Sequence, residues 1–165
     1  MIQLRTNNSL PSNRVHSLFQ YICGGGAVLH TSATHCFYLS IGLGTRSNNY
    51  VEFILLKVLL PFAIEKSCSS LQFFGDLMLI INWIKRAQRC MITLLEPILN
   101  CVLNMISKFD SFSYSHIYRE KKRDVDLLSK KGLQVVFGEV RIVEKDNDTF
   151  CSTTIDLSGT CVDLF

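Results

Sequence analysis

Acidic residues are missing from the first part of this sequence. No Asp or Glu occurs before Glu52, although the chain of 165 residues contains 14 acidic and 17 basic residues. The stretch before Glu52 therefore cannot contribute a carboxylate to a metal site or to acid–base catalysis. The net charge of +3 permits a polyanionic partner, but local clustering of the cations decides whether one binds.

Long apolar runs and closely paired cysteines are missing as well. The most apolar stretch, residues 53–64, contains Lys57 and Pro61 and is far shorter than the roughly 20 apolar residues of a membrane-spanning helix. The seven cysteines include no CxxC pair, so we expect reduced thiols rather than a zinc site or a disulfide framework. The polar N-terminus does not resemble a secretory signal. We therefore expect an intracellular protein, nuclear or cytoplasmic, without a membrane partner.

The order of predicted elements indicates an α/β domain around a mixed sheet. Strands are predicted at 24–30, 35–44, 70–76 and 112–118, and helices at 51–66, 77–89, 96–106 and before Gly132. Pro61 predicts that the first helix kinks or ends early. We divide the chain into an irregular lead (1–20), one domain (21–135) and a C-terminal tail without clear periodicity (136–165).

Three carboxylates occupy corresponding places in these elements. Glu52 opens the first long helix, Asp76 ends a buried strand and Asp126 opens the last helix. Carboxylates at strand ends and helix starts can converge on Mg²⁺, which takes oxygen ligands. Each of the three could instead be an ordinary charge at a helix N-terminus, stabilised by the helix dipole.

The segments around these carboxylates resemble a known family. "NNYVEF", "LQFFGDLMLIINWI" and "SHIYREKKRDVDLLSKKGL" are similar to the ribonuclease H type 1 domain, in the version found in plant retrotransposon-derived proteins. The resemblance extends from about residue 23 to residue 132. It implies a ribonuclease H-like fold, with a mixed central sheet flanked by helices. It also implies hydrolysis of the RNA strand of RNA–DNA hybrids with two Mg²⁺ ions.

The same resemblance assigns roles to catalytic residues. Glu52, Asp76 and Asp126 match the metal-binding carboxylates of the family. His116 matches a histidine that assists proton transfer and product release. The resemblance therefore implies that these four residues form one catalytic site.

Further residues would contact the nucleic acid, either an RNA–DNA hybrid or a duplex similar to double-stranded RNA. Asn48 and Asn49 match amides that contact the backbone in the minor groove. Basic residues beside the motifs would bind phosphates, although each basic group could also be a solvated helix face. They are Lys85, Arg86, Arg89, Arg119, Lys121, Lys122 and Arg123.

One residue of the family pattern has no counterpart. The family carries an Asp on its first strand, in an F-D-G-A-like motif ahead of the Gly-rich second strand, and this Asp bridges both metals. Residues 8–26 stand in that place, so we expect the first strand to be missing or degenerate, with Asn13 as a nearby amide. Leu77 and Lys122 also replace a Ser and an Asn of the family.

Three interpretations follow from this departure. The chain could be an active hybrid ribonuclease, or a nucleic-acid-binding domain of this fold with impaired catalysis. It could also be a non-catalytic structural or interaction remnant of a mobile element. The missing Asp favours the second interpretation.

Overall fold

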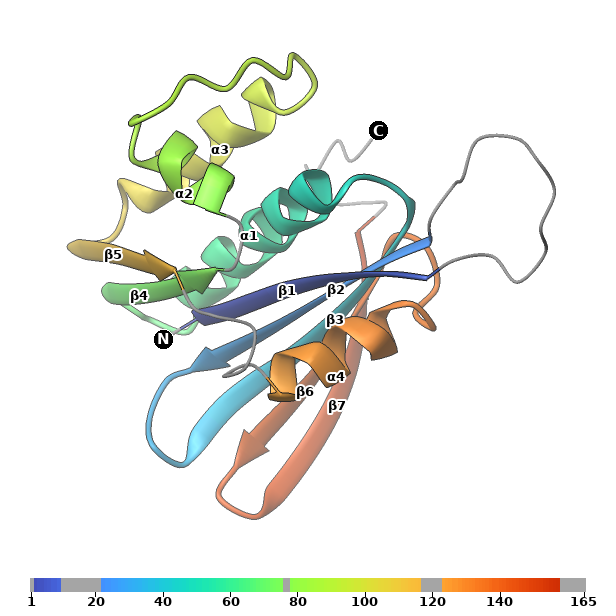
Figure 1. Cartoon of the computed structure of the whole chain (residues 1–165). Coiled ribbons are helices and arrows are strands. Elements are labelled where there is room, and N and C mark those ends of the chain that lie inside the picture. Colours follow the sequence, from blue (N-terminus) through green and yellow to red (C-terminus); the bar gives the residue numbers. More distant parts are fainter. Residues whose placement is uncertain (1, 10–21, 76–77, 117–122, 158–165) are drawn as a thin grey trace, which may run out of the picture.

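The computed structural model describes residues 2–9, 22–75, 78–116 and 123–157 (Figure 1). Its strands and helices alternate irregularly along the chain. They are β1 (Ile2–Ser9), β2 (Ile22–His30), β3 (His35–Thr45), α1 (Asn48–Glu65), β4 (Ser70–Gly75), α2 (Met78–Ile84), α3 (Glu96–Ile106), β5 (Ser111–His116), α4 (Arg123–Gly132), β6 (Glu139–Asp146) and β7 (Thr149–Asp156).

The strands form one mixed sheet with the order β5-β4-β1-β2-β3-β6-β7. β1 runs parallel to β4 and β4 runs parallel to β5. The pairs β1–β2, β2–β3, β3–β6 and β6–β7 are antiparallel. The predicted α/β class with a mixed sheet is confirmed.

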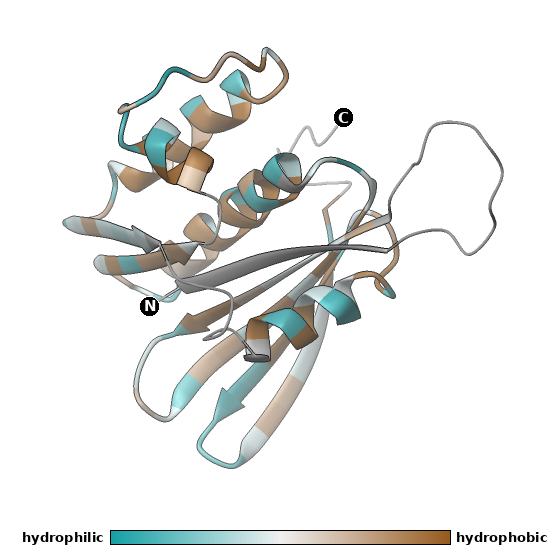
Figure 2. Ribbon diagram, in the orientation of Figure 1, coloured by the Kyte–Doolittle hydropathy of each residue, from teal (hydrophilic) through white to brown (hydrophobic). Residues whose placement is uncertain are grey.

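Helix α1 forms the centre of the core. A helix that is apolar on nearly all sides must be covered on nearly all sides, and α1 packs on β1 and β2 and against α3 (Figure 2). Pro61 is exposed and the helix continues past it to Glu65, so the predicted early end is not found. The buried residues of α1 are Val51, Phe53, Ile54, Leu55, Leu56, Leu59, Leu60 and Ala63. Their packing on both sides of Pro61 outweighs the one backbone hydrogen bond that proline removes.

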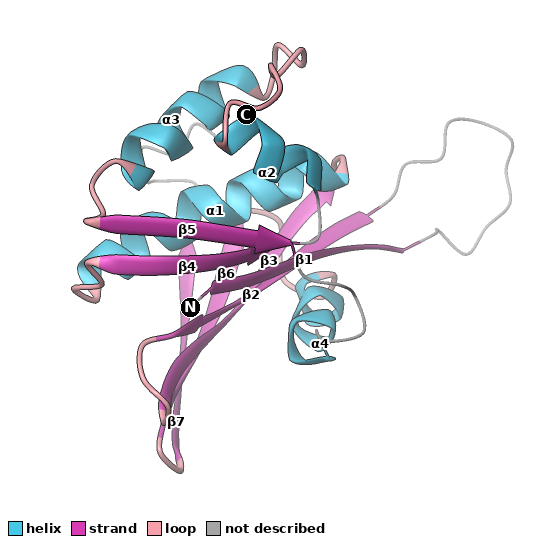
Figure 3. Ribbon diagram, turned by 60° about the vertical axis from the view of Figure 1, so that its left-hand side comes forward, coloured by secondary structure: helices cyan, strands magenta, loops and turns pink. Residues whose placement is uncertain are grey.

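Helix α4 packs on the face of the sheet opposite to α1, α2 and α3 (Figure 3). Two glycines of β2 leave room for it. A Cβ at Gly24 would lie 2.5 Å from the backbone N of Leu133, and one at Gly26 would lie 2.4 Å from the backbone N of Ser129. Side-chain carbons do not approach backbone atoms so closely, so the helix rests directly on the backbone of the sheet.

Three segments differ from the sequence-based expectation. Residues 2–9, expected in an irregular lead, form β1 between β2 and β4, and the first strand is therefore present. Residues 139–156, expected in a tail, form the hairpin β6–β7, which extends the sheet beyond β3. Helix α2 ends at Ile84 rather than near 89, because Arg86 has φ +54° and cannot continue a right-handed helix. In the described ranges, no helix is both long and apolar enough to cross a membrane.

Candidate nucleic-acid and metal site

The strand directions bring several segments to one edge of the sheet. Because β1, β4 and β5 are mutually parallel, their carboxyl ends lie at the same edge. β3 ends there too, since both β1 and β3 are antiparallel to β2. α1 begins just after β3, and α4 is the next helix after β5. The predicted residues Glu52, His116 and Asp126 therefore belong to segments that end or begin at this edge of the sheet.

Glu52 is held in place by the start of α1 and by the end of β4. The backbone N–H of Tyr50 donates a hydrogen bond of 3.3 Å to the Ser47 hydroxyl, which caps the helix. Glu52 follows in the next turn and is 1% exposed. Its Oε1 lies 3.0 Å from the position that a Cβ at Gly75 would occupy. The carboxylate thus reaches the last residue of β4, and the lack of a side chain at Gly75 makes room for it.

Asp126 lies in α4, on the other face of the sheet. Its Oδ2 is 3.1 Å from Nζ of Lys130, one turn further along the helix, and its side chain is 27% exposed. Its backbone carbonyl accepts a hydrogen bond of 2.9 Å from the Ser129 hydroxyl. Asp126 is therefore partly exposed and forms an ion pair with a cation on its own helix.

The start of α4 lies at the same level of the sheet as the end of β4. Val125 packs in a cluster with Val28 of β2. Val28 pairs with Gln3 of β1, which in turn pairs with Phe74 of β4. α1 and α4 therefore approach corresponding positions of the sheet from opposite faces.

The remaining predicted residues are placed only in part. His116 ends β5 in register with Gly75, and Asn48 and Asn49 form the first turn of α1. Other predicted positions lie outside the described residues: Asp76, Leu77, Arg119, Lys121 and Lys122. The convergence of Glu52, Asp76 and Asp126 stays a prediction. Within the described part of the chain, no three His, Cys, Asp or Glu side chains form a group that could hold a metal ion.

A match to a family profile identifies the domain. Residues 21–132, more than half of the chain, match the family described as reverse transcriptase-like. The chain belongs to this reverse transcriptase-like family. A comparison with curated proteins gives no significant match.

Solved structures of ribonucleases H share the fold of this reverse transcriptase-like domain. RNase H1 of the archaeon Halobacterium salinarum is 18% identical, with a TM-score of 0.64 over 81% of this chain and 97% of that one. The N-terminal RNase H domain of a Mycobacterium tuberculosis protein is 16% identical, with a TM-score of 0.64 over 81% and 93%. LC11-RNase H1, solved in complex with an RNA/DNA hybrid, is 16% identical, with a TM-score of 0.65 over 81% and 97%. Identities this low show the fold alone, and the predicted ribonuclease H-like fold is confirmed.

Strand β1 of the reverse transcriptase-like domain contains a residue that the sequence reasoning missed. The strand reads I-Q-L-R-T-N-N-S, and its last four residues stand where the resembled family has F-D-G-A. Asn7 pairs with Gly24 of the Gly-rich strand β2, and we propose it for the place of the Asp. The amide proposed from the sequence, Asn13, lies outside the described residues. A short polar segment ahead of the Gly-rich strand could have indicated β1, but the family pattern was not recognised because Asn stands in place of its Asp.

The donors that the structure describes in the reverse transcriptase-like domain do not by themselves fit a pair of Mg²⁺ ions. Two dications about 3.5–4 Å apart repel each other strongly, and a shared carboxylate offsets that repulsion. Asn7 offers only a neutral amide in the corresponding strand position. Glu52 supplies one fixed carboxylate, whereas Asp126 is paired with Lys130. Among the described residues, therefore, no carboxylate takes the bridging position that two-metal hydrolysis requires.

Basic residues of the reverse transcriptase-like domain follow α2. Nζ of Lys85 lies 4.6 Å from the ring centroid of Tyr114 in β5. Burial raises the pKa of the Tyr114 phenol. Arg86 and Arg89 are exposed and line a pocket of about 300 Å³ that also contains Glu96. Lys85 thus lies over an aromatic ring, whereas Arg86 and Arg89 border a small pocket.

Proposed function

We propose that this domain binds RNA–DNA hybrids, or duplexes of similar shape, at the carboxyl edge of β1, β4 and β5, and that its hydrolytic activity is impaired. The observation that carries the proposal is the position of Glu52, which is 1% exposed and reaches Gly75 at that edge. Burying a carboxylate costs free energy, and such groups are concentrated at functional sites. The hybrid bound by LC11-RNase H1, which has a similar fold, supports the substrate class.

Recognition would depend on the shape of the duplex rather than on base sequence. The wide minor groove of an A-like duplex exposes 2′-hydroxyl groups, to which amide side chains can donate and from which they can accept. Asn48 and Asn49, in the first turn of α1, precede Glu52 by one turn. Arg86 and Arg89 would add contacts to phosphates beyond this region.

A specific observation also favours the alternative, a non-catalytic structural or interaction remnant of a mobile element. The family of the chain is described as reverse transcriptase-like, and Asn7 replaces the bridging carboxylate. Such a remnant would show no preference for a hybrid over a DNA duplex. Comparing the affinity for an RNA–DNA hybrid with the affinity for a DNA duplex therefore distinguishes the two proposed functions.

Glu52→Gln tests the proposed interface. In the presence of a chelator, the wild-type chain should bind a labelled RNA–DNA hybrid more tightly than a DNA duplex of the same sequence, as measured by fluorescence anisotropy. Glu52→Gln should strengthen hybrid binding about threefold, because a neutral amide no longer repels the phosphates. Glu65→Gln, an exposed residue at the other end of α1, serves as the control and should leave the affinity unchanged. Equal effects of both substitutions, or equal affinity for both duplexes, would contradict the proposal.

Arg86→Asn tests the phosphate contact after α2. Asn tolerates the left-handed backbone of Arg86, with φ +54°, so the fold should be kept. Loss of one phosphate contact should reduce the slope of log K against log salt by about 0.9 and weaken hybrid binding a few-fold. Lys108→Asn, which removes an exposed cation after α3, is the matched control. An unchanged salt slope for Arg86→Asn would place this arginine outside the interface.

A further inference from the structure

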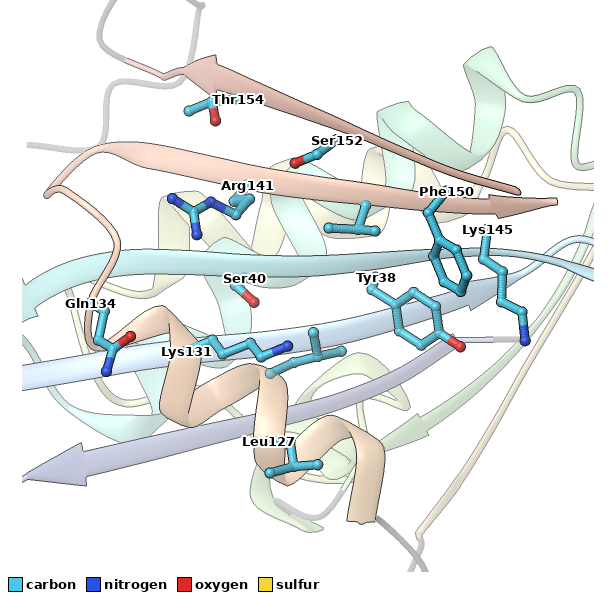
Figure 4. Close-up of a pocket in the computed structure, with 12 residues that line it drawn as sticks. Tyr38, Ser40, Leu127, Lys131, Gln134, Arg141, Lys145, Phe150, Ser152 and Thr154 are labelled. Atoms are coloured by element: carbon cyan, nitrogen blue, oxygen red, sulfur yellow. The ribbon is translucent and has the colours of Figure 1, made fainter. Parts of the chain in front are cut away.

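A groove runs between α4 and the outer strands of the sheet, on the face away from α1. It has a volume of about 820 Å³ and is lined by α4 on one side and by β3, β6 and β7 along its floor (Figure 4). The hairpin β6–β7 lies beyond residues 21–132, which match the family. The groove thus combines a helix of the family domain with a hairpin that follows it.

The groove is positively charged. Lys131 of α4 and Arg141 and Lys145 of β6 line it, and none of its lining residues is acidic. Among the described residues, these three cations form no ion pair. The same hairpin carries five carboxylates, none of which lines the groove: Glu139, Glu144, Asp146, Asp148 and Asp156. A polyanion would therefore meet cations from two elements without an opposing carboxylate.

Two aromatic rings lie at one end of the groove. Figure 4 shows Tyr38 and Phe150 near Lys145, with Arg141 and Gln134 toward the other end. The Phe150 side chain is 65% exposed, and Nζ of Lys145 lies 5.8 Å from its ring centroid. Tyr38 is partly buried, so Phe150 offers the more exposed of the two rings. Exposed rings beside cations form surfaces on which unpaired bases stack while the backbone follows the charges.

We propose that this groove binds single-stranded nucleic acid. The bases in a duplex are already stacked on each other, so only an unpaired strand can use Tyr38 and Phe150. Cations spread along the groove match the regularly repeated phosphates of such a strand. The choice of nucleic acid over other polyanions rests in part on the proposed function. The groove would hold a single strand in addition to the duplex bound at the carboxyl edge.

Arg141→Glu and Phe150→Ala distinguish the contribution of phosphate contacts from that of base stacking. The full-length chain is titrated against fluorescently labelled oligo(U) and oligo(dT) at several salt concentrations, and thermal unfolding verifies that each variant is folded. Arg141→Glu should weaken binding at least about tenfold and reduce the salt slope, because it removes a phosphate contact and adds repulsion. Phe150→Ala should weaken binding about fivefold with an unchanged salt slope, since stacking releases no counterions.

The controls distinguish this groove from other surfaces and other ligands. Lys108→Glu makes the same kind of charge change at an exposed position after α3 and should weaken binding less than twofold. Equal losses in Arg141→Glu and Lys108→Glu would overturn the proposal, as would competition by polyglutamate as effective as that by oligo(U). Hybrid affinity should remain unchanged in Phe150→Ala. Groove-dependent binding of oligo(U) without any hybrid preference would support the groove and refute only the proposed function.

Discussion

Gly26→Ala should lower the free energy of unfolding by about 3 kcal/mol, the upper part of the range for overpacking. The new Cβ would lie 2.4 Å from the backbone N of Ser129 and 2.8 Å from the backbone C of Leu128. Backbone atoms of a helix cannot move aside individually, so α4 as a whole must shift away from β2. That shift would also open the apolar cluster in which Leu128 packs with Val28 and Val125.

Gly25→Ala is the matched control for this effect. A Cβ at Gly25 would lie 2.7 Å from Cδ1 and 2.9 Å from Cγ of Leu55, and 2.8 Å from Cγ2 of Ile41. These atoms belong to individual side chains, which can shift without moving a whole helix. We expect a loss of about 1 kcal/mol, measured for both variants by urea unfolding with equal m-values. A larger loss for Gly25→Ala than for Gly26→Ala would show that α4 does not rest on the glycines of β2.

The parts of the fold that were predicted from the sequence have strong local signals. β2, β3 and β4 are short apolar runs bounded by polar or turn-forming residues, and α3 has a clear helical stripe. Proline near the start of α3 matched the place where a helix tolerates it. Such signals lie within the element itself, so no knowledge of its neighbours is needed.

The parts that were missed depend on partners far away in the chain. β1 is polar, and only its pairing with both β2 and β4 makes it a central strand. All residues of β7 are exposed, so burial leaves no alternating pattern in its sequence. β6 did carry a signal, because Val140 and Ile142 are buried while Arg141 between them is exposed. Asn147, with φ +52°, marks the turn of the hairpin.

The candidate site was predicted in the same uneven way. The apolar run after Glu52 indicated a helix at this place, and Glu52 lies in α1, but its contact with Gly75 depends on how α1 packs over the sheet. Asn7 was missed because the family pattern requires a carboxylate and the sequence offers an amide of almost the same shape. The sequence therefore indicated the chemistry of each element more clearly than it indicated which elements meet.

Asn7→Asp should increase Mg²⁺-dependent cleavage of an RNA–DNA hybrid by at least about a hundredfold. Loss of a residue that only supports a metal ligand typically costs 10–100-fold in metal affinity or activity, so a bridging ligand should matter more. The substitution places a carboxylate in β1, at the edge where Glu52 already reaches Gly75. The added charge should allow two dications to share the site. Cleavage is measured with a labelled hybrid, and Mg²⁺ binding is measured independently by the rise in unfolding temperature.

Asn8→Asp and the double variant Asn7→Asp with Glu52→Gln make this test specific. Asn8→Asp adds the same charge at the next residue of β1, and it should change neither cleavage nor the Mg²⁺-dependent stabilisation. The double variant should lose both gains, since the new carboxylate can hold a dication only together with the existing one. If the gains survived Glu52→Gln, the residues of β1 and α1 would belong to different sites, and the amide at Asn7 would not be the reason for impaired hydrolysis. If the gains in cleavage and in Mg²⁺-dependent stabilisation require both Asn7→Asp and Glu52, the neutral amide at position 7 is what prevents this domain from binding two metal ions.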